Sequence, residues 1–208
     1  MKITQLECLH ADAGFRNFDF LKISTDEGLV GWSEYNESFG GLGVTEVINN
    51  LAGVLIGEDP RPIEKHVARM YAIRRQASGG IAQQAIGAIE NALLDLKAKG
   101  LGIPVYEMLG GPVRDRIRLY WSHCGTYGLS FAQEMQIAPI TSLDDVVEQG
   151  RQAAASGYTA LKTNVFRFDD GQAWLHSPGF WRGEGYPELN ADRNVIHGMC
   201  EQLEAFRE

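Results

Sequence analysis

The sequence predicts an α+β domain over residues 1–112, followed by a β/α segment over residues 113–208. Short segments that alternate apolar and polar side chains come first, and segments with an apolar residue every three or four positions follow them. Beyond residue 113 the order changes to strand, helix, strand, which is typical of a crossover between parallel strands. This order is compatible with a doubly wound sheet or with a (β/α) barrel.

The first domain is predicted to hold three antiparallel strands and then three helices. The strands are expected at residues 2–10, 18–25 and 29–35, and the helices at residues 44–55, 62–75 and 81–99. Residues 26–28, Asp-Glu-Gly, supply the turn of a hairpin between the second and third strands. Gly100 and Gly102 are expected to end the third helix, and Pro104 to prevent its resumption.

The second segment is predicted to hold two strands that flank a helix, and then one more helix. The strands are expected at residues 117–122 and 158–164, and the helices at residues 142–156 and 192–207. Ser142 is the expected N-cap of the first of these helices, because Asp144 and Asp145 lie in its first turn and Gly157 closes it. One apolar face is predicted for the last helix, made of Val195, Ile196, Met199, Leu203 and Phe206.

A long loop over residues 165–190 is predicted between the second strand and the last helix. It is rich in glycine, aromatic and charged residues, and it is long for a connection from a strand to a helix. The composition is compatible with a surface excursion or subunit contact, and also with a lid or substrate wall.

Composition narrows the class of protein. A chain of 208 residues with 44% hydrophobic content can bury an ordinary core. The formal charge of −8 disfavours nucleic acid, whose phosphates bind clustered lysine and arginine. No stretch approaches the ~18 uninterrupted apolar residues of a membrane span, so we expect no membrane interaction. Three cysteines without the spacing of a metal site indicate a reduced, cytoplasmic chain.

Residues 88–111, AIENALLDLKAKGLGIPVYEMLGG, carry a specific motif. This stretch closely resembles the helix and turn that precede the barrel in the enolase superfamily, in its mandelate racemase and muconate lactonizing branch. The segments GLVGWSE at 28–34 and GYTALK at 157–162 extend the resemblance over nearly the whole chain. The resemblance implies an α+β N-terminal capping domain, residues 1–112. The first two β/α units of an incomplete (β/α) TIM-type barrel would follow in residues 113–208, truncated before the third strand.

The resemblance also implies an activity and a cofactor. Members of the family remove the proton next to a substrate carboxylate, and Mg²⁺ held by three carboxylates stabilises the resulting enediolate. Because those carboxylates come from the third, fourth and fifth barrel strands, none of the 27 acidic residues here is predicted as a metal ligand. We therefore expect Mg²⁺ as the cofactor of the family, and no turnover from the 208 residues alone. Two strands leave an open sheet edge, which predicts either a homo-oligomer or a missing C-terminal portion of the barrel.

Lys162 and Asn164 are the predicted catalytic residues. Residues two apart on a strand face the same side, so both side chains would point into the barrel with Thr163 turned away. In the racemases of the family the motif is Lys-x-Lys, and its second lysine usually removes the proton. Asn164 stands at that second position, and an amide is no base near neutral pH. Lys162 would then bind the substrate carboxylate or act as the base itself.

This departure from Lys-x-Lys favours a sugar-acid dehydratase. Dehydration needs an acid to protonate the departing hydroxide, and one-sided proton removal does not require two bases. A racemase, epimerase or cycloisomerase of the same superfamily is the alternative, and a non-catalytic associating fragment is a third. Five residues are predicted to contact a small-molecule sugar acid. They are Asp12, Arg16, Asn17 and Tyr35 in or beside the two cap loops, at residues 10–17 and 36–43, and His123 after the first barrel strand.

Overall fold

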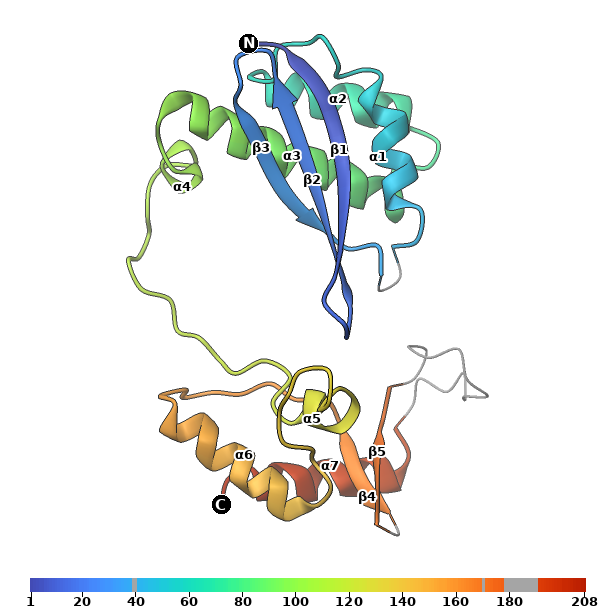
Figure 1. Cartoon of the computed structure of the whole chain (residues 1–208), viewed down its shortest axis with the longest axis vertical. Coiled ribbons are helices and arrows are strands. Elements are labelled where there is room, and N and C mark those ends of the chain that lie inside the picture. The colour runs from blue at the N-terminus through green and yellow to red at the C-terminus, as the bar shows by residue number, and fades with distance from the viewer. Residues whose placement is uncertain (39–40, 170, 178–190) are drawn as a thin grey trace. The chain divides into compact units, whose positions relative to one another are not determined.

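A computed structural model describes residues 1–38, 41–169, 171–177 and 191–208 of the chain (Figure 1). The chain divides into two compact units, Met1–Asp115 and Arg116–Glu208. Each unit has its own hydrophobic core, and each is described by itself.

The first unit is a three-stranded antiparallel sheet with helices on one face, as predicted. Its strands are β1 (Ile3–Asp12), β2 (Asn17–Thr25) and β3 (Val30–Tyr35), in the order β1-β2-β3. Its helices are α1 (Val44–Ala52), α2 (Ile63–Ile73), α3 (Ile81–Leu101) and α4 (Val105–Met108). The turn between β2 and β3 lies where the sequence places it, with Gly28 at φ +80° and its N–H donated to the carbonyl oxygen of Thr25. A positive φ of this kind favours glycine.

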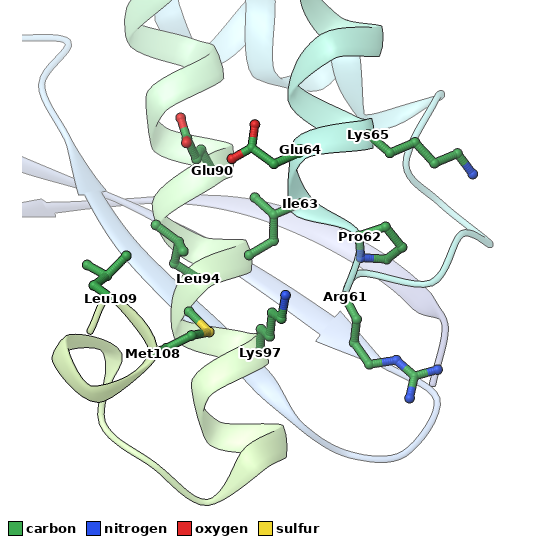
Figure 2. A pocket seen from close by; sticks show the side chains of 10 residues that line it. All are labelled: Arg61, Pro62, Ile63, Glu64, Lys65, Glu90, Leu94, Lys97, Met108 and Leu109. Carbon is green, nitrogen blue, oxygen red and sulfur yellow. The ribbon is translucent and has the colours of Figure 1, made fainter. Parts of the chain in front are cut away.

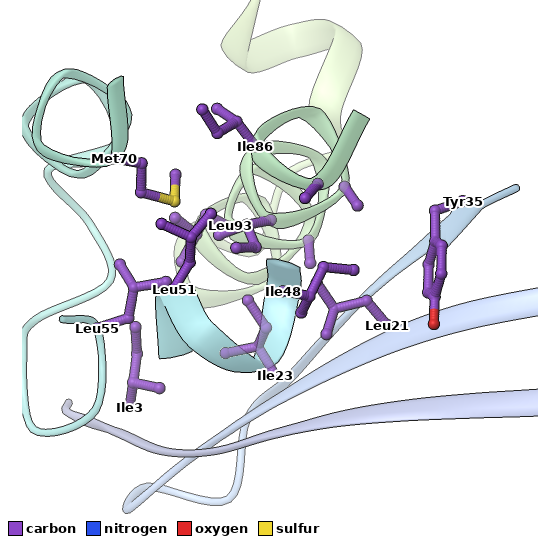
Figure 3. Packing of buried hydrophobic residues seen from close by; sticks show 14 of the residues in the cluster. Ile3, Leu21, Ile23, Tyr35, Ile48, Leu51, Leu55, Met70, Ile86 and Leu93 are labelled. Atoms are coloured by element: carbon purple, nitrogen blue, oxygen red, sulfur yellow. The ribbon is translucent and has the colours of Figure 1, made fainter. Parts of the chain in front are cut away.

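The core of the first unit lies between the sheet and the long helix α3. Figure 3 shows Leu21 and Ile23 of β2 pointing toward Ile48 of α1 and the side chains of α3. The backbones of β3 and α3 come very close, because a Cβ at Gly31 would overlap the carbonyl oxygen of Ala92. Glycine at this position therefore lets the helix lie against the sheet.

The end of α3 and the residues after it differ from the prediction in two respects. The helix continues through Gly100 and ends at Leu101, with Gly102 in the left-handed conformation after it. Pro104 does not prevent a further helix, because the four-residue helix α4 begins directly after it. Proline lacks only an N–H that the first turn of a helix leaves unpaired, so it is compatible with a helix start.

The second unit contains α5 (Thr126–Ser130), α6 (Leu143–Ala155), β4 (Phe166–Asp169), β5 (Gln172–Leu175) and α7 (Arg193–Ala205). The N-cap of α6 is confirmed, since Ser142 Oγ accepts a hydrogen bond from the Asp145 N–H and the Asp145 carboxylate accepts one from the Ser142 N–H. Neither α5 nor the β4-β5 hairpin was predicted. The hairpin lies inside the long loop, of which residues 170 and 178–190 are outside the described residues. The role of that loop stays a prediction.

The two strands predicted at 117–122 and 158–164 are reduced to one parallel bridge, between Trp121 and Leu161. The Trp121 N–H donates to Ala160 O at 3.0 Å, and the Lys162 N–H donates to Trp121 O at 2.8 Å. The two segments therefore run parallel, as predicted, but they do not form the longer ladder of hydrogen bonds expected of two strands. Before the bridge it is the Arg118 side chain that joins the two segments, with hydrogen bonds to the hydroxyl and the carbonyl oxygen of Thr159.

The apolar residues predicted on one face of the last helix differ in burial. Val195 is buried and Phe206 packs against the core of the unit, whereas Ile196, Met199 and Leu203 are exposed. The buried face of α7 is instead made of small and polar residues as well as Val195: Gly198, Gln202 and Ala205. Gly198 packs against the Arg167 side chain, and Gln202 hydrogen-bonds to the backbone of the neighbouring segment.

Candidate active site

Lys162 and Asn164 lie at the end of the second bridged segment of the second unit. The carbonyl oxygen of Lys162 accepts a hydrogen bond from the Cys124 N–H at 2.9 Å, and the Asn164 N–H donates to Thr126 Oγ1 at 3.3 Å. The Lys162 side chain is exposed, and Asn164 is half-buried. These bonds fix the backbone that carries both side chains and leave the ammonium group of Lys162 accessible to solvent.

Thr163 faces α7. Its hydroxyl donates to Cys124 O at 2.8 Å and accepts a hydrogen bond from Gln202 Nε2 at 2.9 Å. In an extended segment the neighbours of such a residue point to the opposite side. Thr163 thus faces α7, and the common orientation of Lys162 and Asn164 on the other side of the segment stays a prediction.

His123 lies at the corresponding end of the first bridged segment. Its backbone is left-handed, with φ +57°, a region that non-glycine residues seldom adopt. Its Nδ1 lies 2.9 Å from Ser122 Oγ, and its ring stacks on Tyr127 with the centroids 5.1 Å apart. The next residue, Cys124, is the one bonded to Lys162 O, so the paired backbones bring His123 and Lys162 to the same end of the two segments. Burial raises the pKa of the Cys124 thiol to about 11, which makes it a poor nucleophile.

The predicted residues of the first cap loop surround the turn between β1 and β2. Asp12 Oδ1 accepts a hydrogen bond from the Gly14 N–H at 2.8 Å, and Asn17 lies opposite Asp12 in the sheet register. The guanidinium of Arg16 lies 4.0 Å from the centroid of the Phe18 ring, and its Nη2 is 3.4 Å from Glu34. Three polar side chains with carboxylate- and hydroxyl-binding chemistry are thus gathered at one turn.

Tyr35 lies in the core of the first unit. Its side chain is 6% exposed, and its hydroxyl lies 2.8 Å from Thr45 Oγ1. Burial raises its pKa above the ordinary value. The ring supports the sheet from inside, so we do not retain Tyr35 among the residues proposed to touch substrate.

Asp19, His10 and Glu37 form a polar cluster around one buried carboxylate, that of Asp19, and sequence reasoning missed it. Asp19 is 3% exposed, and its carboxylate contacts the His10 ring and the Glu37 N–H. The sequence contained one signal for this cluster. Asp19 occupies a core-facing position of β2, in line with the apolar residues Leu21 and Ile23. A charged residue in such a row is costly unless it is hydrogen-bonded, which marks it as a residue with a specific role.

Comparison with known proteins agrees with this architecture. Residues 13–110 match the sequence model of the mandelate racemase / muconate lactonizing enzyme N-terminal domain. The chain belongs to this branch of the enolase superfamily. The predicted capping domain, followed by an incomplete barrel portion, is thereby confirmed.

Two relatives of this enolase-superfamily chain indicate the range of activities. A D-galactonate dehydratase of Xanthomonas campestris pv. campestris (strain B100) is 42% identical over 120 residues, covering 58% of this chain and 31% of its own length. The crystal structure of a proposed L-alanine-DL-glutamate epimerase from Burkholderia xenovorans strain LB400 is 44% identical, with a TM-score of 0.93. That match covers 100% of this chain and 52% of the other. A second structure of that name, with a TM-score of 0.90 and 45% identity over 99% of this chain and 51% of the other, is bound to magnesium and fumarate.

The chain therefore spans about a third to a half of the length of these relatives. Within the described ranges, no three His, Cys, Asp or Glu side chains lie close enough together to hold a metal ion. These residues do not fit the three-carboxylate Mg²⁺ site of the superfamily, and we assign no chemical step of this chain to a metal. In the same ranges, no helix is long and apolar enough to cross a bilayer.

A pocket of 390 Å³ lies elsewhere on the capping domain, between α2, α3 and α4 (Figure 2). Its walls combine apolar side chains such as Leu94 and Met108 with the charged groups of Arg61, Lys65 and Lys97. Arg61 is paired with Asp59 in a fork of hydrogen bonds. None of the residues predicted to be catalytic or to contact substrate lines this pocket.

Proposed function

We propose that this chain supplies the cap and the first two β/α units of an enzyme that dehydrates a sugar acid. The supporting observation is the pairing of two parallel segments that brings His123 and the accessible amine of Lys162 to the same end. Active sites of (β/α) barrels are built at this end of the strands.

The reaction begins with removal of the proton from the carbon next to the carboxylate. The electron pair passes through the enediolate and expels the hydroxyl of the adjacent carbon, which leaves as water after it receives a proton. The enol that remains becomes a 2-keto acid. The overall change is loss of one water molecule, with no oxidation or reduction.

Each side chain of the site has a role in this proposal that suits its chemistry. The ammonium group of Lys162 pairs with the substrate carboxylate, or in its neutral form removes the proton. The Asn164 amide donates hydrogen bonds to substrate oxygens and cannot serve as the base. His123 binds substrate beside Lys162. Asp12 and Asn17 of the capping domain bind hydroxyl groups, while Arg16 binds a carboxylate.

An epimerase is the second candidate, because the Burkholderia neighbour that covers the whole of this chain bears that name. Epimerisation needs a second base on the opposite face of the carbon, and Asn164 stands where the racemases carry their second lysine. The two candidates therefore differ in whether residues from outside this chain supply a base opposite Lys162.

We also propose that the 208 residues turn over no substrate by themselves. The described residues do not provide the carboxylates of a metal site, and the chain spans about half of the neighbour's length. The missing groups would come from a further barrel portion or from another copy of the chain. Light scattering tests the alternative of an associating, non-catalytic chain, since a stable monomer would count against it.

A chimera tests the proposed reaction. The chain is joined to the part of the Burkholderia neighbour that follows the matched region, and it is assayed with magnesium and a panel of sugar acids in D₂O. We expect formation of a 2-keto acid, while the 208-residue chain alone is inactive. Deuterium incorporation with inversion and without loss of water would favour the epimerase. A folded chimera that exchanges no substrate proton would overturn the shared chemistry.

A further inference from the structure

Asp19 is a buried carboxylate at the end of the sheet that carries both cap loops. In the register of the sheet it lies opposite His10 of β1 on one side and opposite Tyr35 of β3 on the other. β1 ends at Asp12, two residues beyond His10, where the β1-β2 turn begins, and the segment 36–43 starts directly after Tyr35. Asp19 is therefore placed between the two segments by strand alternation alone.

The carboxylate of Asp19 holds one group on each side. Its Oδ1 lies 2.7 Å from His10 Nδ1, and its Oδ2 accepts a hydrogen bond from the Glu37 N–H at 2.8 Å. A second hydrogen bond joins the segment 36–43 to the start of β2, because the Ser38 hydroxyl lies 3.5 Å from the carbonyl oxygen of Asn17.

Glu37 carries the connection onward to α1. Its carboxylate accepts hydrogen bonds from the N–H groups of Gly43 at 2.8 Å and Thr45 at 3.1 Å, and from the Thr45 hydroxyl. The N-cap of α1 is Gly43, which has no side chain to cap the helix, so Glu37 satisfies these N–H groups instead. The two ends of the segment 36–43 are thus tied together, and Asp19 holds the first end.

The hydrogen bonds that Asp19 accepts favour its ionised form. Burial by itself would raise the pKa of Asp19, but the hydrogen bonds from His10 and from the Glu37 N–H outweigh burial and lower it. The bonds at neutral pH are therefore charge-assisted, which makes them stronger than bonds between neutral groups. Other titratable groups that face this cluster are Cys8 on β1, Tyr35 on β3 and the Glu37 carboxylate, with Glu46 on α1 farther along.

We propose that Asp19 is a positioning residue that couples the β1-β2 turn to residues 36–38 and, through Glu37, to residues 43–45, so that the backbone hydrogen bonds of these parts form and break together. Its importance for substrate selection rests on the proposed function, in which these loops cover the substrate. The coupling itself is a property of the capping domain and can be measured without turnover.

Hydrogen exchange on the intact 208-residue chain tests the coupling. In Asp19→Asn, we expect peptides covering 11–18 and 36–45 to exchange about tenfold faster or more, because charge-assisted bonds are lost, while α2 keeps its protection. The matched control is Glu7→Gln, which removes the carboxylate of an ion pair with Lys22 on the same sheet and touches neither loop. Loosening of only one segment, of neither, or of both in the control as well would overturn the proposal.

A second variant keeps the test decisive if Asp19→Asn does not fold. His10→Gln removes the ring on one side of Asp19 and leaves the Glu37 N–H bond in place. We expect faster exchange in 36–45, and unchanged exchange there would contradict the coupling.

The pH dependence separates coupling from simple loss of packing. In the wild type, extra protection of both segments, corrected for intrinsic exchange, should disappear together as pH falls through the pKa of Asp19. In Asp19→Asn the β1-β2 turn should show no such step, whereas residues 43–45 keep the step that titration of Glu37 causes. An equal step in the β1-β2 turn of the variant would overturn the proposal. An inactive chimera with intact coupling would instead overturn only the proposed reaction.

Discussion

The Gln202 side chain of α7 donates a hydrogen bond from Nε2 to the carbonyl oxygen of Asn164 at 2.9 Å, from a position that is 1% exposed. The same amide group donates to Thr163 Oγ1 and accepts from the Phe166 N–H. One polar side chain of α7 thus bonds to three residues of the segment that follows Lys162. Buried polar groups of this kind are costly to leave without partners.

Gln202→Leu should destabilise the second unit. The substitution keeps most of the side-chain volume but leaves Asn164 O and the Phe166 N–H without this partner, at an expected cost of about 2–3 kcal/mol in the free energy of unfolding. Urea unfolding measured by circular dichroism gives the difference. Gln149→Leu on α6 is the matched control, because that glutamine is half-buried and its side chain donates a hydrogen bond to the side chain of Gln152 on the same helix. We expect a change below about 0.5 kcal/mol there.

Gly31→Ala should destabilise the first unit. The new Cβ would overlap Ala92 O and lie 2.8 Å from Leu96 Cβ, so β3 and α3 must separate. Overpacking of this kind costs roughly 1–3 kcal/mol, which thermal unfolding would show as a lower Tm. Gly53→Ala is the control, since nothing lies within 4 Å of a Cβ at that position. Equal shifts for the two variants would contradict the close approach.

Lys162→Ala should abolish chemistry in the chimera without affecting the fold. The side chain is exposed and the bonds of its backbone are kept. Loss of a proton-transfer or carboxylate-binding group should lower the rate of deuterium exchange at the carbon next to the carboxylate by roughly 10²–10⁴-fold. Lys97→Ala, in the pocket of the capping domain, serves as the control and should keep the wild-type rate. A Lys162→Ala chimera with undiminished exchange would remove Lys162 from the mechanism.

Glu37 should make the capping domain sensitive to acid. Burial opposes ionisation of this carboxyl, but hydrogen bonds from the Thr45 hydroxyl and from the Gly43 and Thr45 N–H groups outweigh it and lower its pKa. Because the folded-state pKa is lowered, the stabilisation is present above the unfolded-state value of about 4.3 and is lost as pH falls through the folded-state value. Unfolding measured between neutral and acidic pH should therefore show a smaller loss of stability in Glu37→Gln.

The exposed Glu134 provides the comparison for that pH series. Glu134→Gln should keep the acid dependence of the wild type. If the two glutamine variants gave the same pH profile, the hydrogen bonds of Glu37 would not be the source of the acid sensitivity.

Local signals in the sequence predicted most of the fold. Alternation placed β1, β2 and β3, helical spacing placed α1, α2 and α3, and Ser142 with Asp145 marked the start of α6. Three short elements of the part that the structure describes were not predicted, namely α4, α5 and the β4-β5 hairpin. The sequence also provided no indication that Gln202 of α7 is buried, because it is held by hydrogen bonds to residues 163–166, and no local pattern reveals such a distant partner.

The candidate site also combines features that the sequence predicted with features that only the structure shows. Residue types and the resemblance to a family predict the chemistry of Lys162, Asn164 and His123. Their position at the same end of two paired segments depends on the bridge between Trp121 and Leu161. Tyr35 was predicted to contact substrate beside a cap loop, but its side chain lies in the core cluster and its hydroxyl is hydrogen-bonded with that of Thr45.

The sequence by itself determined the class of the fold, the family and the kinds of side chain available for chemistry, because these follow from periodicity, turn residues and short motifs within the chain. Only the tertiary structure decided which polar side chains are buried and what they hold, as Asp19 and Gln202 show. The physical reason is that the stability of a buried polar group depends on partners brought together by packing, and those partners are distant in sequence.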